Sequence, residues 1–459
     1  MRVSVRLVGT LVAVLVVATI GWAGYRWLQA WHQPGAGAAD SVSYWLEPGV
    51  PDAAVKRAIT LTGAVPEVIS DRRKADLVIT RSPSDDTSEI LSNSIGAPVT
   101  PLSGAEFVKP EPTSGYFAAP GVQVGNTGLI QRVIARLTKP AVASGPEWTM
   151  DVVGDIGLGR SIYTGMVAHH DFDYPFEAFQ GELKSADLAV ANLECALSDQ
   201  HAVVTDSGMT FVAPVKAAQG LKDAGIDAVS VANNHSYNGG PGGFTDTLAA
   251  LNDLGVKPFG GGNNAAEAHK ARIINVKGVR VGLLGYSAIV GSNPAGAGTP
   301  GMAFISMAPW GPLNETDVTH MEQDIRAAKK QADVVIPYFH WGTEYTHDAN
   351  ADQRSVAHRA IEAGADVVLG SHPHWTQGVE WYNGRLIAYS LGNFIFDQAW
   401  GDETKRSAIL KMTFSGKRLQ SAEFLPYDIV DNSKPQPAAA DSAVKTLNDI
   451  FSHSWWVKP

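Results

Sequence analysis

Polar side chains suited to binding metal ions stand at or just after the ends of several hydrophobic segments. In each case an apolar run of five to seven residues leads into Asp, Glu, Asn or His. Burying these groups without partners costs free energy, so packing alone does not explain their positions. They are Asp155 after Thr149–Gly154, Glu194 after Asp187–Asn192, Asn234 and His235 after Asp227–Ala232, His340 after Asp333–Phe339, and His372 and His374 after Asp366–Gly370.

The types of these side chains narrow the chemistry of the site. Carboxylates, an amide and imidazoles without thiolates suit Mn, Fe or Zn. Six such ligands are too many for one tetrahedral zinc ion, but they suit two divalent ions that share a bridging carboxylate. Two ions ~3.5–4 Å apart can activate water and hold both oxygens of an in-line displacement. The expected ligands are Asp155, Glu194, Asn234, His340, His372 and His374.

The segments that carry these residues have the pattern of strands in a sheet covered on both faces. They are rich in Val, Leu and Ile without alternation, and amphipathic helical stretches such as Asp317–Gln331 and Asp352–Ala363 lie between several of them. In open α/β sheets, ligands bind at the carboxyl ends of the strands. The pattern therefore predicts an α/β sandwich with its site at one sheet edge.

Several of these residues also have a purely structural interpretation. Asp155 could cap a turn, and Glu194 could be a solvated loop carboxylate. His340 could be a core histidine with satisfied hydrogen bonds. Asn234 and His235 could belong to an Asn-rich turn. The chain has no P-loop, His-Glu-x-x-His or Gly-x-Ser-x-Gly motif that would point to another chemistry.

The composition excludes several classes of protein. The chain has 459 residues, of which 45% are hydrophobic, so it can bury a large core. Its 36 Lys and Arg against 46 Asp and Glu give a net charge of −10, which argues against nucleic acid as a partner. Cys195 is the single cysteine, so an intrachain disulfide and a Cys-rich metal site are both excluded.

The N-terminus carries an export element, which we assign to residues 1–31. Arg2 and Arg6 precede the uncharged run Leu7–Tyr25, whose 19 residues would span ~28 Å as a helix, close to a bilayer core. This pattern predicts a single membrane-spanning helix with the rest of the chain outside the cytoplasm. The alternative is a cleaved signal peptide and a secreted protein, because Ala36-Gly37-Ala38 resembles a cleavage site.

Two further domains are expected beyond this segment. A Gly-, Ala- and Pro-rich tether occupies residues 32–40, and a small α/β domain of unknown role covers residues 41–143. In the small domain we expect helices over Asp52–Leu61 and Asn126–Leu137 and a strand over Ala75–Thr80. The domain with the candidate site covers residues 147–459.

Seven motifs between Trp148 and Asp428 resemble the CapA family of capsule (poly-γ-glutamate) synthesis proteins, which is similar to the calcineurin-like metallophosphoesterases. The resemblance implies a four-layer α/β/β/α sandwich of metallophosphoesterase type. The motifs, in chain order, are GDIGLGR, DYPFE, NLECALSD, ANNHSYNGGPGG, HWGTEY, GSHPHWTQGVE and YSLGNFIFD.

The resemblance also implies roles for individual residues. It places two divalent ions on the six ligands named above and makes His235 the acid that assists the leaving group. Arg160, Glu344 and Tyr345 match motif positions near the site, where they would contact substrate.

The resemblance further implies a biological role and partners. The role is capsule or poly-γ-glutamate synthesis, export or anchoring, by hydrolysis of a phosphoester or γ-glutamyl bond. The partners would be an envelope polymer or small anionic substrate, the membrane through the N-terminal helix, and the capsule synthesis machinery. A metal-dependent protein that holds a polyanion without catalysis, and a general exported phosphatase, are the alternatives.

The sequence departs from the metallophosphoesterase pattern at two positions and from the CapA pattern at a third. The Asp-x-His start of those enzymes is Asp155-Ile156-Gly157 here, so one ion lacks a histidine ligand. Glu194 stands where those enzymes bridge the two ions with Asp. Asn238 stands where the CapA family often has Asp.

Overall fold

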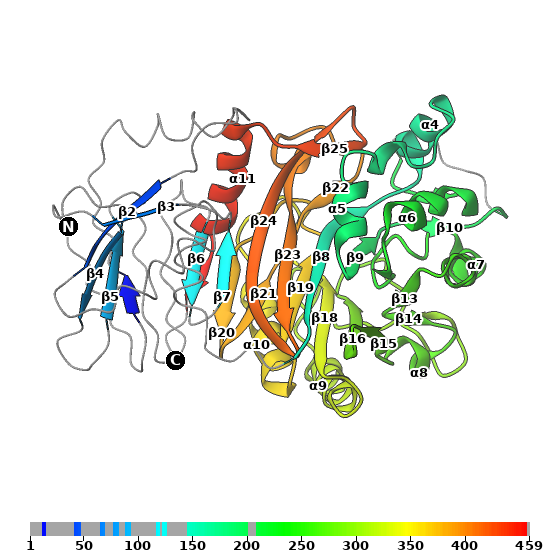
Figure 1. Cartoon of the computed structure of the whole chain (residues 1–459). Coiled ribbons are helices and arrows are strands. Elements are labelled where there is room, and N and C mark those ends of the chain that lie inside the picture. Colours follow the sequence, from blue (N-terminus) through cyan, green and yellow to red (C-terminus); the bar gives the residue numbers. More distant parts are fainter. Residues whose placement is uncertain are drawn as a thin grey trace. The chain divides into compact units, whose positions relative to one another are not determined.

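The computed structural model divides into two compact units, which are described separately (Figure 1). The first comprises Met1–Ala143, Leu419–Glu423 and Trp456–Pro459, and the second comprises Ser144–Arg418 and Phe424–Trp455. The structure describes residues 12–14, 41–46, 65–68, 77–81, 88–92, 116–119, 122–125, 145–200 and 208–456.

The first unit contains a five-stranded sheet, and β4 lies where a strand was expected. The expected helices Asp52–Leu61 and Asn126–Leu137 lie outside the described residues. In spatial order the strands are β1 (Val12–Val14), β5 (Ser88–Ser92), β4 (Leu77–Arg81), β2 (Ser41–Leu46) and β3 (Val65–Val68), and β6 (Tyr116–Ala119) and β7 (Val122–Gly125) form a hairpin.

The expected membrane helix needs a correction at three residues. Val12–Val14 form strand β1, which pairs with β4 and β5, whereas a helix was expected over Leu7–Tyr25. β-Branched valines favour extended backbone, which is consistent with this pairing. The rest of the segment lies outside the described residues. Among the described residues, no helix combines the length and the apolar character needed to cross a membrane.

The first sheet of the second unit has a parallel centre, in which β8, β9 and β12 run side by side. Its spatial order is β13 (Lys257–Phe259), β12 (Ala228–Ser230), β9 (Leu188–Leu193), β8 (Glu147–Ile156), β23 (Arg406–Ser415) and β24 (Arg418–Val430), with β22 (Asn393–Ile395) beside β8 and β25 (Lys434–Pro437) beside β24.

The second sheet also has a parallel centre, formed by β16, β18, β19 and β21. Its spatial order is β15 (Arg272–Val276), β16 (Val279–Ser287), β18 (Val334–His340), β19 (Val367–Ser371), β21 (Arg385–Ala388) and β20 (Val379–Tyr382). Shorter strands are β10 (Ala196–Leu197), β11 (Val212–Ala213), β14 (Gly261–Gly262), β17 (Gly301–Met302) and β26 (Trp455–Trp456).

The two sheets face each other, and helices cover their other faces. Alternation along β18 turns Tyr338 toward the first sheet, where its hydroxyl donates to the Val153 carbonyl (3.4 Å), and turns Phe339 toward the helices. On the first sheet pack α4 (Arg160–Ala168), α5 (Gln180–Ser185), α6 (Gln219–Ala224) and α7 (Gly240–Leu254); on the second pack α9 (Glu315–Lys329) and α10 (Ala351–Ala363). The unit is therefore a mixed α/β fold.

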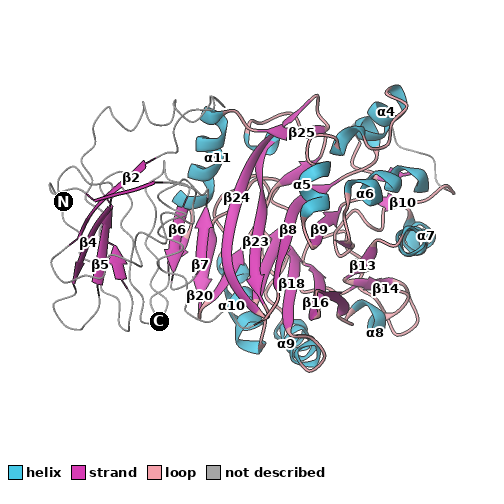
Figure 2. Ribbon diagram, viewed as in Figure 1, coloured by secondary structure: helices cyan, strands magenta, loops and turns pink. Residues whose placement is uncertain are grey.

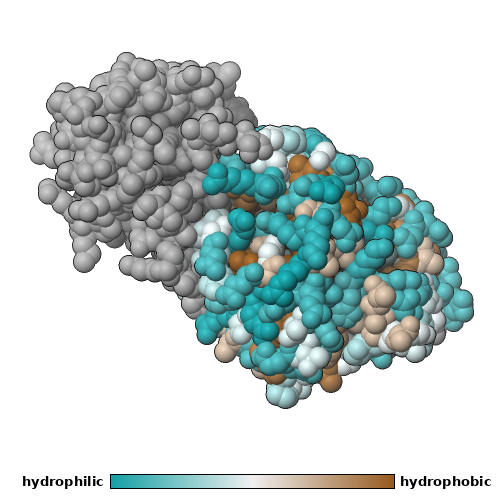
Figure 3. Space-filling model, turned by 90° about the horizontal axis from the view of Figure 1, so that it is seen from below, coloured by the Kyte–Doolittle hydropathy of each residue, from teal (hydrophilic) through white to brown (hydrophobic). Residues whose placement is uncertain are grey.

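The C-terminal part of the second unit contains elements that we did not predict. Figure 2 shows the long strands β23 and β24 beside β8, and α11 (Ala440–Ser452) follows them in the chain. The remaining helices are α8 (Ala265–Ala268) and the short 3₁₀ helices η1 (Tyr174–Phe176), η2 (Val215–Ala218) and η3 (Glu403–Lys405). Figure 3 shows a largely hydrophilic face of this unit, in which hydrophobic residues are scattered.

Candidate metal centre

The parallel strands bring the predicted ligands to one edge of each sheet. Asp155 near the end of β8 pairs in register with Asn192 near the end of β9. In the second sheet, His340 at the end of β18 pairs with Ser371 at the end of β19, and His372 follows immediately. The topology thus places these strand ends at a common edge in each sheet.

Two buried carboxylates lie at the centre of the site. Asp155 and Glu194 have no exposed surface. The Asn192 side-chain amide donates to Asp155 Oδ1 (2.8 Å) and to Glu194 Oε2 (3.4 Å). Asn233 in turn donates to Asn192 Oδ1 (3.0 Å), which fixes the orientation of that amide. Sequence reasoning missed Asn192, although an Asn inside a buried strand is a polar residue that needs partners.

His340 and Asn234 come together beside Glu194. His340 Nε2 lies 2.9 Å from Asn234 Oδ1 and 3.8 Å from Glu194 Oε1, and its Nδ1 lies 3.1 Å from Ser371 Oγ. Asn234 is partly exposed, whereas His340 is fully buried. The first sheet thus supplies the amide and the second sheet supplies the imidazole.

The segment His372-Pro373-His374 places two imidazoles in the site. Both histidines adopt left-handed backbone, with φ of 97° and 58°, which is costly for residues other than glycine. His374 Nδ1 lies 2.8 Å from Asn393 Oδ1, so this contact assigns the proton to Nδ1. The other nitrogen, Nε2, is then free to act as a ligand and lies 4.0 Å from Glu194 Oε1.

Several buried polar atoms of the site have no hydrogen-bond partner among the described residues. Both ring nitrogens of His372, which is 1% exposed, and Oε1 of Glu194 have no hydrogen-bond partner among them. Such atoms are rare because leaving them unpaired costs about 1–3 kcal/mol each. Ligand atoms of Asp155, Glu194 and His374 all lie within 4.8 Å of one another. This donor set fits divalent cations.

Burial shifts the pKa of every titratable ligand. It raises the pKa of Asp155 to about 6 and the pKa of Glu194 well above its usual range. It lowers the pKa of His374 to about 3 and holds the pKa values of His340 and His372 well below 6.5. The imidazoles are therefore neutral at pH 7, which is the form that binds a metal ion.

His235 lies beside the ligands without joining them. Its ring packs 3.9 Å from the ring of Phe211, and its Nε2 lies 3.9 Å from Glu194 Oε1. Nδ1 lies 3.0 Å from Asn238 Oδ1, which also accepts from the Phe211 backbone amide (2.7 Å). Burial lowers the pKa of His235 to about 4, so the free protein holds it as a neutral imidazole at pH 7.

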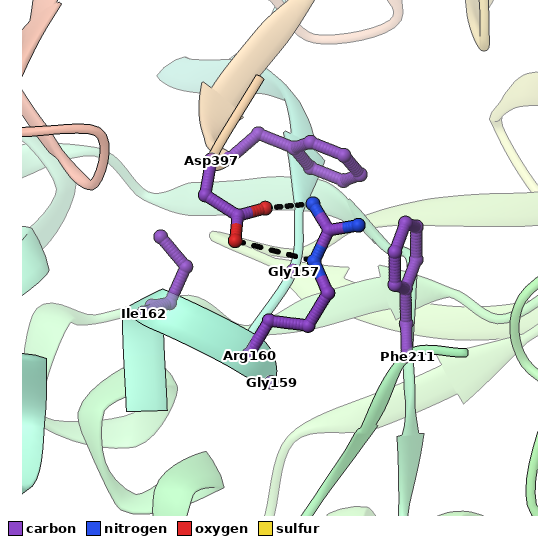
Figure 4. A pocket seen from close by; sticks show the side chains of 7 residues that line it. Gly157, Gly159, Arg160, Ile162, Phe211 and Asp397 are labelled. Carbon is purple, nitrogen blue, oxygen red and sulfur yellow. Dashed lines mark hydrogen bonds and ion pairs between the residues drawn. The ribbon is translucent and has the colours of Figure 1, made fainter. Parts of the chain in front are cut away.

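Arg160 is already paired with a carboxylate that we did not single out. Its guanidinium forms an ion pair with Asp397, stacks over the Phe211 ring at 4.1 Å and donates to the Gly208 carbonyl (2.8 Å). Figure 4 shows this pair in a small pocket between α4 and the end of β22, next to Gly157. The expected substrate contact of Arg160 stays a prediction.

Glu344 and Tyr345 lie on the loop that follows β18. Carboxylate and imidazole atoms of Glu344, His372 and His374 fall within 4.8 Å of one another. The Tyr345 ring lies 6.2 Å from the His374 ring and 6.2 Å from the exposed Trp400. The structure thus brings both residues to the site, and their contact with substrate stays a prediction.

Comparison with known proteins places the site within a described family. Residues 149–398 match the family model of the bacterial capsule synthesis protein PGA_cap. The capsule biosynthesis protein CapA of Bacillus anthracis is 32% identical over 298 residues, which cover 64% of this chain and 70% of that protein. The PGA biosynthesis protein CapA of Bacillus subtilis is 31% identical over 314 residues, which cover 67% and 79%.

A more distant relative agrees with these two. A "probable polyglutamine synthesis accessory protein" of Mycobacterium tuberculosis is 28% identical over 289 residues, which cover 61% of this chain and 74% of that protein. Among solved structures, a hypothetical protein from Thermus thermophilus matches with a TM-score of 0.39 at 14% identity, covering 61% and 99%, a score too low to support a common fold. The matches to the family model and to both CapA proteins show that this chain belongs to the CapA (PGA_cap) family of bacterial capsule synthesis proteins.

Proposed function

We propose that the chain is a metal-dependent hydrolase of metallophosphoesterase type, which cleaves a phosphoester or γ-glutamyl bond during synthesis, export or anchoring of a capsule polymer. The observation that carries the proposal is the set of buried donors without partners, His372 and Glu194 Oε1, at the ends of strands from two sheets. Structural packing gives no reason to bury them there, whereas bound cations would satisfy them.

The proposed centre holds two divalent ions, Mn, Fe or Zn, on six protein ligands. When bound, such ions activate water and stabilise the charge that develops on the reacting oxygens. Asn192 holds Asp155 and Glu194 in place, and Asn393 fixes the tautomer of His374. The ligands are Asp155, Glu194, Asn234, His340, His372 and His374.

The remaining residues would handle substrate and protons. His235 offers Nε2 toward the site, while its Nδ1 is held by Asn238. To act as an acid it must take up a proton together with the substrate, because its pKa in the free protein is about 4. An anionic leaving group would favour that uptake, since nearby negative charge raises the pKa of an imidazole. Substrate contacts of Arg160, Glu344 and Tyr345 belong to the same proposal.

The names of the relatives support a polymer as the substrate. Two are capsule or PGA biosynthesis proteins and one is a polyglutamine synthesis accessory protein. We propose an envelope polymer or a small anionic precursor as the substrate and the capsule synthesis machinery as the partner. The N-terminal segment would direct export of the chain, with its later domains outside the cytoplasm.

Two observations favour a non-catalytic alternative, in which the centre only holds a polyanion. His235 is neutral, and the Arg160 guanidinium is already paired with Asp397. A holder needs fixed cations alone, whereas a catalyst also needs a proton donor.

Metal analysis combined with a substrate panel tests the proposal. Protein purified without chelator should contain about two divalent ions per chain and should hydrolyse at least one of a set of phosphoesters and γ-glutamyl peptides. The double variant His372→Ala with His374→Ala should lose most of the metal. Full metal content in that variant would show that the site lies elsewhere, and metal binding without any hydrolysis would favour the holder.

A further inference from the structure

The centre lacks one ligand that metallophosphoesterases have, because a glycine occupies the position of that ligand. Gly157 stands where those enzymes have the histidine of Asp-x-His. A Cβ atom at Gly157 would lie 3.3 Å from the ring of Phe396. That ring packs against His374, with 5.0 Å between ring centroids. Asp155, Glu194 and His374 therefore form a group of three ligands without the fourth.

A carboxylate from a different element lies next to this group. Ligand atoms of Glu344, His372 and His374 lie within 4.8 Å of one another, so Glu344 shares His374 with the first group. Glu344 is partly buried, and no hydrogen bond or ion pair joins its carboxylate to another described residue. An oxygen ligand in this place suits the same Mn, Fe or Zn ions.

Hydrogen bonds tie the Glu344 loop to the segment that carries the two histidines. The Trp341 amide donates to the Ser371 carbonyl (3.1 Å), and the Tyr345 amide donates to the Pro373 carbonyl (2.9 Å). These two contacts flank Glu344 on both sides in the sequence. These backbone contacts thus hold the loop at Glu344 beside the segment with His372 and His374.

A glycine makes this loop possible. Gly342 has a φ of 94°, in the left-handed region. A Cβ atom there would lie 2.7 Å from the side chain of Gln353. Gln353 completes the capping box of α10 with Asn350 and donates to the Gln377 side chain (2.9 Å), so it cannot easily move aside.

We propose that Glu344 is a direct ligand of the metal centre, and that its carboxylate replaces the missing histidine at the ion held by His374. This inference rests on the metal centre of the proposed function. It differs from the substrate contact expected for Glu344 from the family resemblance, because a ligand acts on metal affinity before any substrate is present.

Metal titration of three proteins tests the assignment. Wild-type protein, Glu344→Gln and Asp348→Asn are stripped with chelator and titrated with Mn²⁺ or Zn²⁺ by calorimetry, without substrate. Asp348 is the matched control, because it is an exposed acid on the same loop and belongs to neither ligand group. Glu344→Gln should bind one of the two ions at least about tenfold more weakly, since even groups that only orient ligands contribute about 10–100-fold. Asp348→Asn should match wild type.

Additional readouts separate the possible failures. Equal affinity for both ions in Glu344→Gln and wild type would overturn the inference and leave the proposed function intact. A wild-type protein that binds no metal would instead overturn the proposed function. Melting temperatures of the stripped proteins should agree, which excludes misfolding of Glu344→Gln. Glu344→Asp, which keeps a carboxylate, should retain more affinity than Glu344→Gln; equal loss in both would also contradict a ligand role.

Discussion

In the absence of metal, the buried Asp155 carboxylate should lower the free energy of unfolding, and substitution of Asp155 should reveal this effect. Its folded pKa of about 6 lies above the ordinary 3.8, so ionisation destabilises the metal-free fold increasingly as the pH rises from about 4 to above 6. That gap corresponds to about 3 kcal/mol as an upper limit. Asp155→Asn should therefore raise the free energy of unfolding at pH 8 and change it little at pH 4.

Urea denaturation in the presence of chelator measures this difference. The same substitution should abolish binding of at least one ion, so a gain in stability would accompany a loss of function. If Asp155→Asn is equally or less stable than wild type at pH 8, the carboxyl is better solvated than its complete burial indicates.

Substitution of His235 should distinguish catalysis from metal binding. It stands next to the expected ligand Asn234 but uses Nδ1 for Asn238, so its removal leaves every expected ligand in place. His235→Ala should keep its metal content and lose hydrolysis by about 10²–10⁴, the usual contribution of general acid catalysis. The loss should be smaller for a nitrophenyl ester, whose leaving group needs no proton. Unchanged hydrolysis and capsule production in this variant, with capsule lost in Asp155→Ala, would favour the holder.

Asn238 sets the proton affinity of His235. Asn238→Asp should raise the pKa of His235, because a carboxylate about 3 Å from Nδ1 stabilises the imidazolium, and Oδ1 can still accept from the Phe211 amide. The imidazole then stays protonated to higher pH. NMR titration of the metal-free variant measures the change. An unaltered pKa would mean that residue 238 does not control this ring.

At the scale of elements, the strands around the site could be predicted, because each is a mainly apolar run that ends at or just before a polar residue. The strands β8, β9, β18 and β19 lie within a few residues of the expected bounds. The strands β23 and β24 escaped prediction, because Lys411 interrupts the hydrophobic pattern of β23, Gln420 and Glu423 interrupt that of β24, and Pro426 lies inside β24.

The contacts that orient the site residues join different elements of the fold. Asn192 connects Asp155 to Glu194, and Asn393 of β22 orients His374. Asp397, which follows β22, pairs with Arg160 at the start of α4. Asp397 lies 237 residues from Arg160, and the contact of Asn192 with Asp155 depends on the register of β9 against β8, so spacing alone does not identify these partners. The expected ligands could be named from the sequence because each follows a hydrophobic segment directly or within a few residues.

The loop after β18 should behave as one unit with Glu344. Gly342→Ala should weaken metal binding, because a Cβ atom would meet Gln353 and force the loop to shift. In a Glu344→Gln background the same change should have little further effect on metal affinity, since the displaced carboxylate is already gone. Calorimetry of the four proteins in this cycle tests the coupling. Strictly additive losses would show that the loop acts on the metal through another residue.

At the scale of the whole molecule, charge sets how a polyanionic substrate could approach. The chain carries a net charge of −10, so long-range electrostatics repel an acidic polymer. Attraction must then be local, and the proposed divalent ions at the strand ends are its natural source. This concentrates recognition at the metal centre instead of spreading it over a basic surface.

The export predicted from the N-terminal segment can be tested on cells. An uncharged run after Arg2 and Arg6 predicts that everything beyond residue 40 lies outside the cytoplasm. A protease added to intact protoplasts or spheroplasts of an expressing bacterium should therefore degrade this part, while a cytoplasmic marker protein in the same cells should survive. Replacing Arg2 and Arg6 with Glu should reduce the fraction that is accessible, because positive charge on the cytoplasmic side sets the orientation. Complete protection of the chain in cells whose marker is also intact would contradict export, and the substrate would then have to be sought among cytoplasmic anions.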